Sequence, residues 1–326
     1  MVLDGKKCIF VNFIRIMNTD IIISPVDGLK LSLIYAEPEG TPRGIIQIAH
    51  GMCEHKERYI PLMEFLCKNG FAVVCNDHRG HGRSVKSGED LGFMGKDGWL
   101  ALVEDLKAVT LWAKDRWPGL PFTLFGHSMG SLAVRSYVRR YDREVDGLIV
   151  CGCPSDNPAK GAGILLARMF GRIKGWHYRP KILQKLSFGA YNRPFEKEGW
   201  PSAWVCSDPD VLKAYHADPL CQFVFTADGF LNLLLLMKDC YSTDWTAGRP
   251  GLPVYFISGA QDPCRVSDKA LGQAVQAMKD RGYEYVSLKL YPGLRHEIHN
   301  ETRHEEVWAD ILSFSMDLGH VTGRKP

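Results

Sequence analysis

Short apolar runs recur along the chain, and most of them end at Gly, Pro, Asn or Asp. Runs of this length, rich in Val, Ile and Phe, are typical of β-strands. We predict eight strands, at residues 21–24, 29–36, 44–49, 71–76, 121–125, 147–153, 254–258 and 286–291. A turn is predicted at Asp27 and Gly28, between the first two runs, and we interpret these as a hairpin with a two-residue turn. The third run, GIIQIA, is uninterrupted and β-branched, as expected of a strand that is buried on both faces.

Helix-like stretches lie between the later strands. They cover residues 56–69, 99–116, 132–141, 270–281 and 301–317. Strands that alternate with helices imply a parallel sheet with helices on both of its faces. The sequence therefore predicts an α/β fold, built on a doubly wound, mostly parallel sheet of eight strands.

The segment at residues 155–245 interrupts this alternation. Its pattern indicates several helices rich in Trp, Phe and Leu, which are separated by Pro and Gly. Since strands resume after it, we interpret this segment as an insertion into the sheet domain. We predict a core made of residues 1–154 and 246–326, with a helical cap at residues 155–245.

The composition is that of an ordinary globular protein. The chain has 326 residues, 45% of them hydrophobic and 24% charged, so intrinsic disorder is disfavoured. The net charge of +3 is small and no long basic run is present, so nucleic acid is not an expected partner. Of ten cysteines, four fall inside predicted strands or helices and indicate buried, reduced thiols. Cys151 and Cys153 form a CxC pair, but no second pair at zinc-binding spacing accompanies it, and we predict no metal site.

The first sixteen residues contain one apolar run, at residues 8–16. It is interrupted by Asn12 and Arg15 and lacks a small-residue cleavage site, so it is too short and too polar for a signal peptide or membrane span. By default we expect a cytoplasmic location. Translation from Met1 and translation from Met17 both fit the pattern.

A GxSxG sequence follows the fifth predicted strand and precedes a helix. Gly126, Ser128 and Gly130 form it, within FTLFGHSMGS. This order of strand, sharp turn and helix is typical of a nucleophile elbow, where Gly is needed because neighbouring backbone lies very close. Ser128 is therefore the candidate nucleophile.

A serine hydroxyl needs a base, and the base needs a group that orients it. In folds with this elbow, the acid and then the histidine follow the serine along the chain. His296 follows the last predicted strand and is the candidate base, with His299 as its close rival. Asp262 follows the strand VYFISG and is the candidate acid, at the strand end where such sheets bind ligands. Asp244 and Asp268 are nearby alternatives.

Acyl transfer also requires two N–H groups that bind the oxyanion. One is expected from Met129, directly after the nucleophile. The other is expected from Met52, in the loop after the strand at residues 44–49, where Gly51 permits a tight turn. These backbone groups form the predicted oxyanion hole.

Several longer motifs resemble the monoacylglycerol lipase and lysophospholipase group of the α/β-hydrolase superfamily. They are HGMCEHKERY at residues 50–59, DHRGHGRS at 77–84, GHSMG at 126–130, SGAQDP at 258–263 and HEIHNE at 296–301, and in the cap SFGAYNRPF at 187–195 and HADPLCQFVFT at 216–226. The resemblance covers nearly everything after residue 20. It implies a serine ester hydrolase without a cofactor, in which Glu54, His55 and Arg58 shape the mouth of the site and DHRGHGRS braces it.

The cap is expected to determine specificity. Its Leu, Phe, Met and Trp residues suit an apolar acyl chain, so a single-chain lipid ester such as monoacylglycerol is the expected substrate. Candidate substrate-binding residues are Glu54, Arg58, His127, Leu233 and Leu236. The apolar cap residues fit an acyl tunnel, transient contact with a membrane surface, or the core between cap and sheet.

Other functions also fit the motifs. A lysophospholipase and a carboxylesterase for small esters share them, and a ligand-binding protein that retains the fold without catalysis is disfavoured because no triad residue is missing. The oligomeric state is left open by the sequence.

Overall fold

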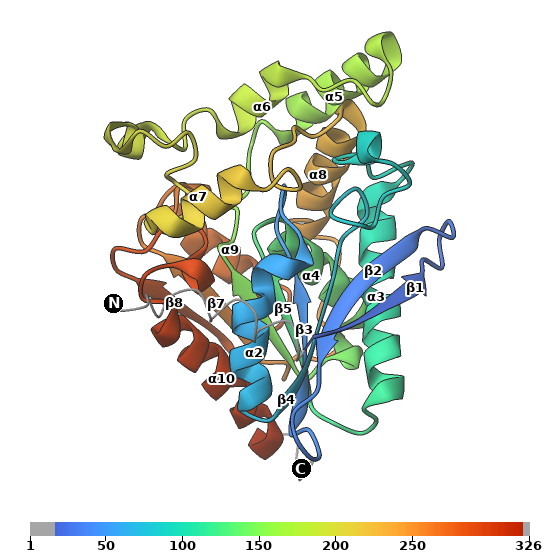
Figure 1. Ribbon diagram of the computed structural model, residues 1–326, viewed down its shortest axis with the longest axis vertical. Coiled ribbons are helices and arrows are strands. Elements are labelled where there is room, and N and C mark those ends of the chain that lie inside the picture. Colours follow the sequence, from blue (N-terminus) through green and yellow to red (C-terminus); the bar gives the residue numbers. More distant parts are fainter. Residues whose placement is uncertain (1–16, 322–326) are drawn as a thin grey trace, which may run out of the picture.

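The computed structural model describes residues 17–321 (Figure 1). The apolar run at residues 8–16 and Met1 lie outside these residues. The strands are β1 (Asn18–Ile23), β2 (Lys30–Ala36), β3 (Gly44–Ala49), β4 (Phe71–Asn76), β5 (Phe122–His127), β6 (Gly147–Cys151), β7 (Val254–Gly259) and β8 (Val286–Tyr291). The α-helices are α2 (Ile60–Lys68), α3 (Gly98–Arg116), α4 (Met129–Tyr141), α5 (Lys160–Lys174), α6 (Lys181–Phe188), α7 (Pro209–Ala217), α8 (Ala227–Cys240), α9 (Asp268–Asp280) and α10 (His304–Val321).

All eight strands form one sheet, in the order β1-β2-β4-β3-β5-β6-β7-β8. The pairs β1–β2 and β2–β4 are antiparallel, and the other five pairs are parallel. The prediction of a mostly parallel, eight-stranded sheet is therefore confirmed. Every residue of β3, β4, β5 and β6 is buried, as their uninterrupted apolar sequences indicate.

The predicted two-residue turn of the first hairpin is wrong. Strand pairing ends at Ile23 and Lys30, so six residues separate β1 from β2. Pro25 lacks an N–H for the ladder, and the connection is closed instead by the Ser24 N–H, which donates to the Leu29 carbonyl over 2.8 Å. Gly28 takes the left-handed conformation that this loop requires, with φ of 73°.

Helices cover both faces of the sheet (Figure 1). Side chains of α2 and α10 share one buried cluster with residues of the sheet, and those of α3, α4 and α9 share a second. α9 shows how the sequence produces such a helix. Its buried residues Leu271, Ala274, Val275 and Met278 recur at helical spacing, and the Ser267 hydroxyl caps its first turn by accepting from the Ala270 N–H.

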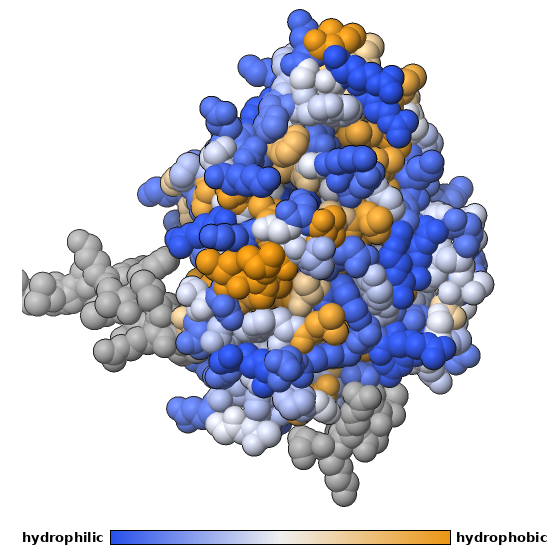
Figure 2. Space-filling model, turned by 90° about the vertical axis from the view of Figure 1, so that its right-hand side faces the viewer, coloured by the Kyte–Doolittle hydropathy of each residue, from blue (hydrophilic) through white to orange (hydrophobic). Residues whose placement is uncertain are grey.

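Residues 155–245, called the cap segment below, lie between β6 and β7 and contain α5, α6, α7 and α8 but no strand. Figure 1 shows α5 and α6 at the top of the molecule, beyond the carboxyl ends of the parallel strands. Both ends of the segment, at residues 155 and 245, fall in irregular loops. In the side view of Figure 2, hydrophobic and hydrophilic side chains lie next to each other at the top of the molecule.

Among the described residues, all nine cysteines are buried and none forms a disulfide, as predicted for four of them. None of the described helices combines the length and the apolar character needed to cross a membrane.

Candidate active site

Ser128 lies at the sharp turn between β5 and α4. Its backbone has φ of 54° and ψ of −117°, a region that residues other than Gly rarely adopt and that costs on the order of 1–3 kcal/mol. The turn is held from β6, because the Ser128 N–H donates to the Cys151 carbonyl over 3.0 Å. A Cβ added to Gly130 would lie 2.1 Å from the Ala49 oxygen, and one added to Gly126 would lie 2.4 Å from the Gly130 oxygen. The elbow therefore requires Gly on both sides of the serine.

The loops after β7 and β8 bring a carboxylate and an imidazole together. His296 Nδ1 lies 3.0 Å from Asp262 Oδ2, and the Cys264 N–H donates to Asp262 Oδ1 over 2.8 Å. Burial alone would raise the pKa of Asp262, but the His296 imidazole and the Cys264 amide outweigh it and lower that pKa. Burial would likewise lower the pKa of His296, but Asp262 holds it well above its ordinary value. The pair is thus an oriented imidazole backed by an ionised carboxylate.

The rival residues have different surroundings. His299 is fully buried, and neither of its ring nitrogens has a hydrogen-bond partner among the described residues. Its ring stacks on Tyr59 instead, with centroids 4.8 Å apart. The Asp244 side chain is 68% exposed and pairs with Arg139, and the Asp268 side chain is 78% exposed and pairs with Arg265. None of the three rivals belongs to an imidazole–carboxylate pair.

Ser128 and His296 line the same cavity. Within residues 17–321 no hydrogen bond joins the serine hydroxyl to the imidazole, and His296 Nε2 instead lies 3.9 Å from Cys264 Sγ. Such bonds are often long in a free enzyme and shorten when substrate binds. Cys264 is a neighbour that the sequence did not identify.

The two expected oxyanion amides face no competing acceptor. Neither the Met52 N–H nor the Met129 N–H donates to another group among the described residues, and both residues line the cavity. The Gly51 carbonyl, which belongs to the same peptide unit as the Met52 N–H, accepts from His50 Nδ1 over 2.8 Å. Because the C=O and N–H of a peptide point in opposite directions, this bond directs the Met52 N–H away from His50.

A second group holds the same loop. Glu54 is buried and accepts from the Gly51 N–H, from Tyr59 Oη over 2.9 Å and from Arg58 Nη1 over 3.0 Å, while His127 Nδ1 lies 3.1 Å from the same carboxylate. Burial opposes ionisation of Glu54, but His127 and Arg58 lower its pKa well below the ordinary value. Glu54 therefore acts as an anionic anchor for the loop that carries the Met52 N–H, called the oxyanion loop below after its predicted role.

Arg58 lies behind the cavity wall and does not line it. Its guanidinium forms two bonds, of 2.5 and 2.6 Å, with the carboxylate of Glu297, which does line the cavity. The structure thus places Glu54 and His127 at the cavity but not Arg58, because the bonds to Glu54 and Glu297 hold its guanidinium behind them.

The DHRGHGRS segment packs behind the oxyanion loop. The His78 N–H donates to His50 Nε2 over 2.9 Å, which leaves the proton of His50 on Nδ1, where it reaches Gly51. Arg79 pairs with Asp105 over 2.8 Å, and Lys56 Nζ pairs with Asp77 over 2.6 Å. The brace that the resemblance implied is present in these contacts.

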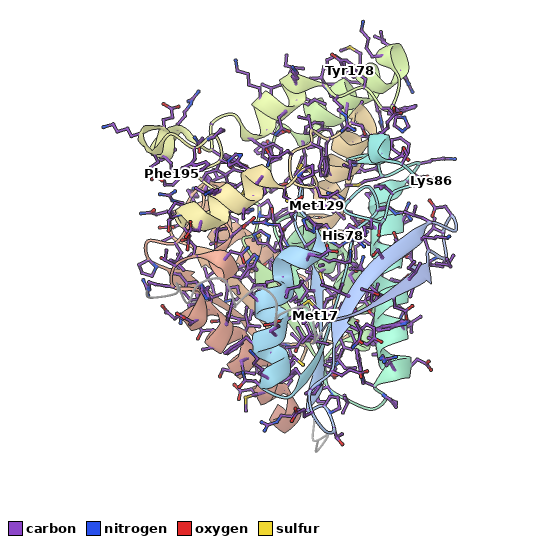
Figure 3. The ribbon with its side chains drawn as sticks, in the orientation of Figure 1. Met17, His78, Lys86, Met129, Tyr178 and Phe195 are labelled. Atoms are coloured by element: carbon purple, nitrogen blue, oxygen red, sulfur yellow. The ribbon has the colours of Figure 1, made fainter. Side chains whose placement is uncertain are left out.

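A cavity of about 640 Å³ extends from Ser128 into the cap segment. Figure 3 shows Met129 at the centre of the molecule, with Tyr178 and Phe195 on the cap segment above it. The apolar side chains of the cavity wall include those of Leu132, Phe188, Trp204, Phe223, Leu233, Leu234 and Met237. The volume and lining suit one flexible apolar chain.

The prediction that Leu236 binds substrate in the cavity is wrong. Leu233 lines the cavity, but Leu236 is fully buried in the core cluster and does not line it. The apolar run LNLLLLMK gives no sign of which side faces the substrate. The sequence also missed Trp204, whose ring lies 5.0 Å from that of His296, because it belongs to an irregular stretch without periodicity.

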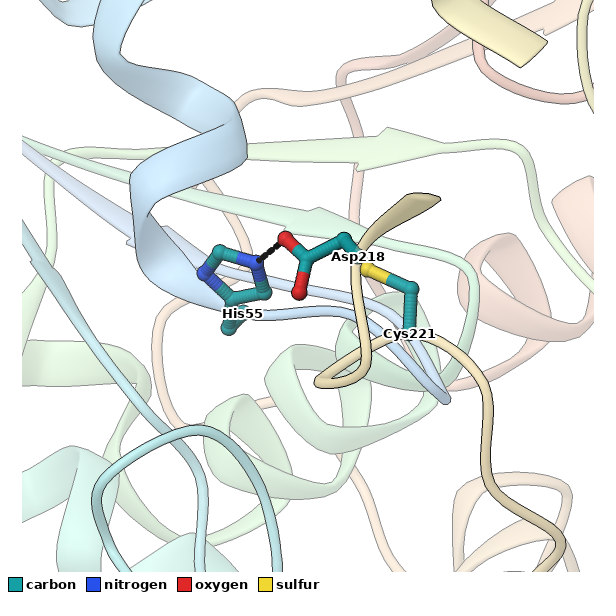
Figure 4. Close-up of side chains that lie close together, drawn as sticks. All are labelled: His55, Asp218 and Cys221. Atoms are coloured by element: carbon teal, nitrogen blue, oxygen red, sulfur yellow. Dashed lines mark hydrogen bonds and ion pairs between the residues drawn. The ribbon is translucent and has the colours of Figure 1, made fainter. Parts of the chain in front are cut away.

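His55 joins the core to the cap segment. Its Nε2 lies 2.7 Å from Asp218 Oδ2, with Cys221 beside them (Figure 4), and its Nδ1 lies 2.7 Å from Glu57 Oε2. Burial would lower the pKa of His55, but the two carboxylates raise it. His55, Asp218 and Cys221 have ligand atoms close enough for one metal ion, as do Asp262, Cys264 and His296. In both groups the histidine is already paired with a carboxylate.

The sheet, the elbow and the cavity beside it define an α/β hydrolase of the lipase and esterase class. The model of the family described as "Serine aminopeptidase, S33" matches residues 40–303, and the chain belongs to this family of serine hydrolases.

Relatives and solved structures agree with this class. The chain is 30% identical to a monoacylglycerol lipase of Mycolicibacterium smegmatis over 290 aligned residues. These cover 89% of this chain and 94% of the relative. It is 26% identical over 280 residues to the monoglyceride lipase of Homo sapiens, covering 84% of this chain and 82% of that protein. A thermostable carboxyl esterase from Bacillus coagulans, solved with glycerol, superposes with a TM-score of 0.82 and 27% identity over 93% of this chain and 99% of the esterase.

Proposed function

We propose that the protein hydrolyses carboxylic esters of single-chain lipids, and that monoacylglycerol is the preferred substrate. The observation that carries the proposal is the convergence of three features at one cavity: the elbow serine, the His296–Asp262 pair and two amides without an acceptor. A non-catalytic binding protein would have no need of the strained serine backbone.

In the proposed mechanism, Ser128 Oγ attacks the ester carbonyl while His296 Nε2 takes the hydroxyl proton. Asp262 keeps the imidazole in the correct tautomer and stabilises its protonated form. The Met52 and Met129 N–H groups bind the oxyanion, at about 3 kcal/mol each. His296 then gives its proton to the departing alcohol, and water repeats these steps on the acyl-enzyme to release the fatty acid.

The cap segment supplies the proposed acyl site. We assign the cap to residues 155–245, because its side chains form the apolar wall of the cavity opposite Ser128. The similarity to two monoacylglycerol lipases supports this choice of substrate.

Hydrolysis of small carboxylic esters is a second candidate. The similarity to a carboxyl esterase over 93% of this chain favours it. The two activities share one mechanism and differ only in how much of the cavity the acyl group fills.

Acyl-chain length distinguishes the two. We expect kcat/KM for monoacylglycerols, from acetyl to oleoyl, to rise by about fourfold for each methylene buried, until the cavity is full. Lysophosphatidylcholine, measured in parallel, reports whether a phosphate headgroup is accepted. A maximum at the acetyl ester would instead favour the small-ester activity.

The Ser128→Ala variant is the matched control, with an expected loss on the order of 10⁶ in kcat. It should also abolish labelling by a fluorophosphonate. Unchanged turnover in this variant would rule out the proposed nucleophile.

A further inference from the structure

One buried histidine lies where a loop of the core meets the cap segment. His55 belongs to the connection between β3 and α2, and its side chain is only 7% exposed. Asp218 and Cys221 belong to the irregular stretch that follows α7. Each of the three side chains offers one ligand atom, and these atoms lie within 4.8 Å of one another (Figure 4). Core and cap segment therefore contribute to one cluster of possible metal ligands.

The two ring nitrogens of His55 have separate carboxylate partners. Nδ1 lies 2.7 Å from Glu57 Oε2, and Nε2 lies 2.7 Å from Asp218 Oδ2. The ammonium of Lys56 lies 2.9 Å from the other oxygen of Glu57 and 2.6 Å from Asp77, so a cation already occupies the space between these two carboxylates. A histidine that binds a metal through one nitrogen almost always donates its other N–H to a carboxylate, a carbonyl or water. Glu57 is placed for that outer role, which leaves Nε2 for the metal.

The contact between Nε2 and Asp218 requires a positive charge. With the ring proton on Nδ1, the lone pair of Nε2 faces a carboxylate oxygen at 2.7 Å, and two acceptors at this distance repel each other. The charge between them is either the second proton of a charged imidazole or a metal ion. Cys221 adds a third ligand beside this position. Its N–H donates to the Asp218 carbonyl over 3.0 Å, so one turn carries both ligands of the cap segment.

We propose that His55, Asp218 and Cys221 bind a zinc ion, which links the cap segment to the core. One nitrogen, one oxygen and one sulfur ligand suit Zn²⁺, whereas Mg²⁺ and Ca²⁺ prefer oxygen ligands alone. Sequence spacing did not predict this site, because 163 residues separate His55 from Asp218 and zinc-binding motifs are recognised by short spacings. The ion takes no part in ester hydrolysis.

Binding requires only a small local movement. In a tetrahedral zinc site a nitrogen and an oxygen ligand lie about 3.3 Å apart. The Asp218 carboxylate must therefore withdraw from His55 by about 0.6 Å, and its turn is irregular and its side chain 30% exposed. Zinc displaces the proton between Nε2 and Asp218 and the proton of the Cys221 thiol, and both pass to solvent. Water completes the tetrahedron, since Cys221 lines the cavity.

The similar group beside the nucleophile is less suited to a metal. There the Asp262 carboxylate lies on Nδ1 of His296, while the Cys264 sulfur lies 3.9 Å from Nε2. A metal on Nε2 would have Cys264 as its one further ligand from this group. In the His55 group, by contrast, Glu57 holds Nδ1 and a second carboxylate remains for the metal.

Metal binding is measured on the full chain after removal of metal with a chelator. Co²⁺ serves as the probe, because a thiolate ligand gives it a charge-transfer band in the near ultraviolet. We expect this band to saturate with one equivalent of Co²⁺ and to disappear when Zn²⁺ is added. The melting temperature should rise with the concentration of Zn²⁺, since the ion binds the folded chain, and should not change with Mg²⁺. Absence of the band would overturn the proposal.

Two cysteine variants locate the ion. Cys221 and Cys264 are both buried, both line the cavity and both belong to a group of one His, one Asp and one Cys, so they form a matched pair. Cys221→Ser should abolish the band, and Cys264→Ser should retain it. A band that survives Cys221→Ser, or one that Cys264→Ser removes, would overturn the proposal.

Glu57→Gln tests the outer carboxylate while all three ligands remain. Loss of such a partner weakens metal affinity by about 10- to 100-fold, so this loss is expected, with the band still present at saturating Co²⁺. The persistent band also shows that the variant folds. Unchanged affinity would mean that Glu57 does not orient a metal-bound His55, and the proposed arrangement would be wrong.

Hydrolysis distinguishes this site from the proposed catalytic pair. A zinc ion on Nε2 of His296 would block the proposed base, whereas one on His55 leaves it free. Turnover of a short soluble ester should therefore continue at the zinc concentration that saturates the rise in melting temperature. Inhibition at that concentration, relieved by Cys264→Ser, would overturn the proposal. The spectrum and the melting temperature report on the zinc site whether or not the proposed function is correct.

Discussion

The Asp262→Asn substitution tests the proposed acid at the level of single hydrogen bonds. Asp262 uses one oxygen to accept from Cys264 N–H and the other for His296 Nδ1. An Asn side chain has one oxygen and one NH₂ group. The backbone N–H cannot change its role, so the Asn oxygen is expected to face Cys264 and the NH₂ group to face His296.

This arrangement forces the wrong tautomer on the base. A donor opposite Nδ1 makes that nitrogen an acceptor, so the proton of neutral His296 moves to Nε2, the atom that must take the proton of Ser128. The expected loss in kcat is about 10⁴, with the fold unchanged. Initial rates on a soluble ester, together with a thermal unfolding curve, measure the two effects separately.

The pH profile gives an independent readout of the same substitution. In wild type the carboxylate raises the pKa of His296, so kcat/KM falls as the pH drops through this raised value and the imidazole becomes protonated. Without the carboxylate the pKa falls, so the acidic limb of the variant is expected at lower pH.

Asp244→Asn is the matched control, since Asp244 is exposed and its side chain pairs with Arg139 and Ser242, away from His296. It should retain wild-type activity. If Asp262→Asn kept its activity and Asp244→Asn lost it, the assignment of the acid would be refuted.

Three other substitutions or conditions address the elbow and the oxyanion loop. Gly130→Ala places a methyl group within 2.1 Å of a carbonyl oxygen, so a loss of more than about 4 kcal/mol in the free energy of unfolding is expected, measured by denaturant titration. Burial lowers the pKa of His78 to about 3 and that of His81 to about 4. Because the unfolded chain binds protons below pH 6.5 that the folded protein does not, each histidine is expected to lower the free energy of unfolding by about 2 kcal/mol at pH 5. Equal unfolding free energies at pH 7 and pH 5 would contradict this expectation. Glu54→Gln removes the carboxylate that accepts from the Gly51 N–H of the oxyanion loop. A hydrogen bond to a charged group contributes about 1.5–3 kcal/mol, so kcat should fall by tenfold or more, with little change in KM. A raised KM with normal kcat would instead make Glu54 a substrate-binding residue.

Much of the fold could be predicted because its signals are local. The bounds of β3, β4 and β8 agree with the apolar runs, since short β-branched segments between turn residues have few alternatives. The turn after β1 was mistaken because Asp27 and Gly28 form a local turn signal, whereas the register depends on where Pro25 ends the ladder.

In the candidate site, too, the residues that follow a simple rule of the fold could be predicted, and those that depend on packing could not. Chain order and the position after a predicted strand selected His296 and Asp262. The structure brings these two side chains together because the carboxyl ends of neighbouring parallel strands meet at one edge of the sheet. No such rule governs the cap. Leu236 was assigned to the cavity because the apolar run LNLLLLMK does not tell which of its residues face the cavity, which is decided by packing against other helices. Trp204 was missed because it lies in an irregular stretch without periodicity.

The proposed function assigns catalysis and substrate selection to different parts of the fold. The atoms proposed to perform the reaction belong to strand ends and tight turns, where the backbone leaves little freedom: Ser128 in its strained turn, and the Met52 amide directed by the bond between His50 and Gly51. The atoms proposed to select the substrate belong to helices α6 and α8 of the cap segment, which line the cavity. A substitution such as Leu233→Ala should therefore change the preferred acyl length while the rate on an acetyl ester stays near that of wild type. If both fell together, the cap would have to take part in positioning the catalytic groups as well as the acyl chain.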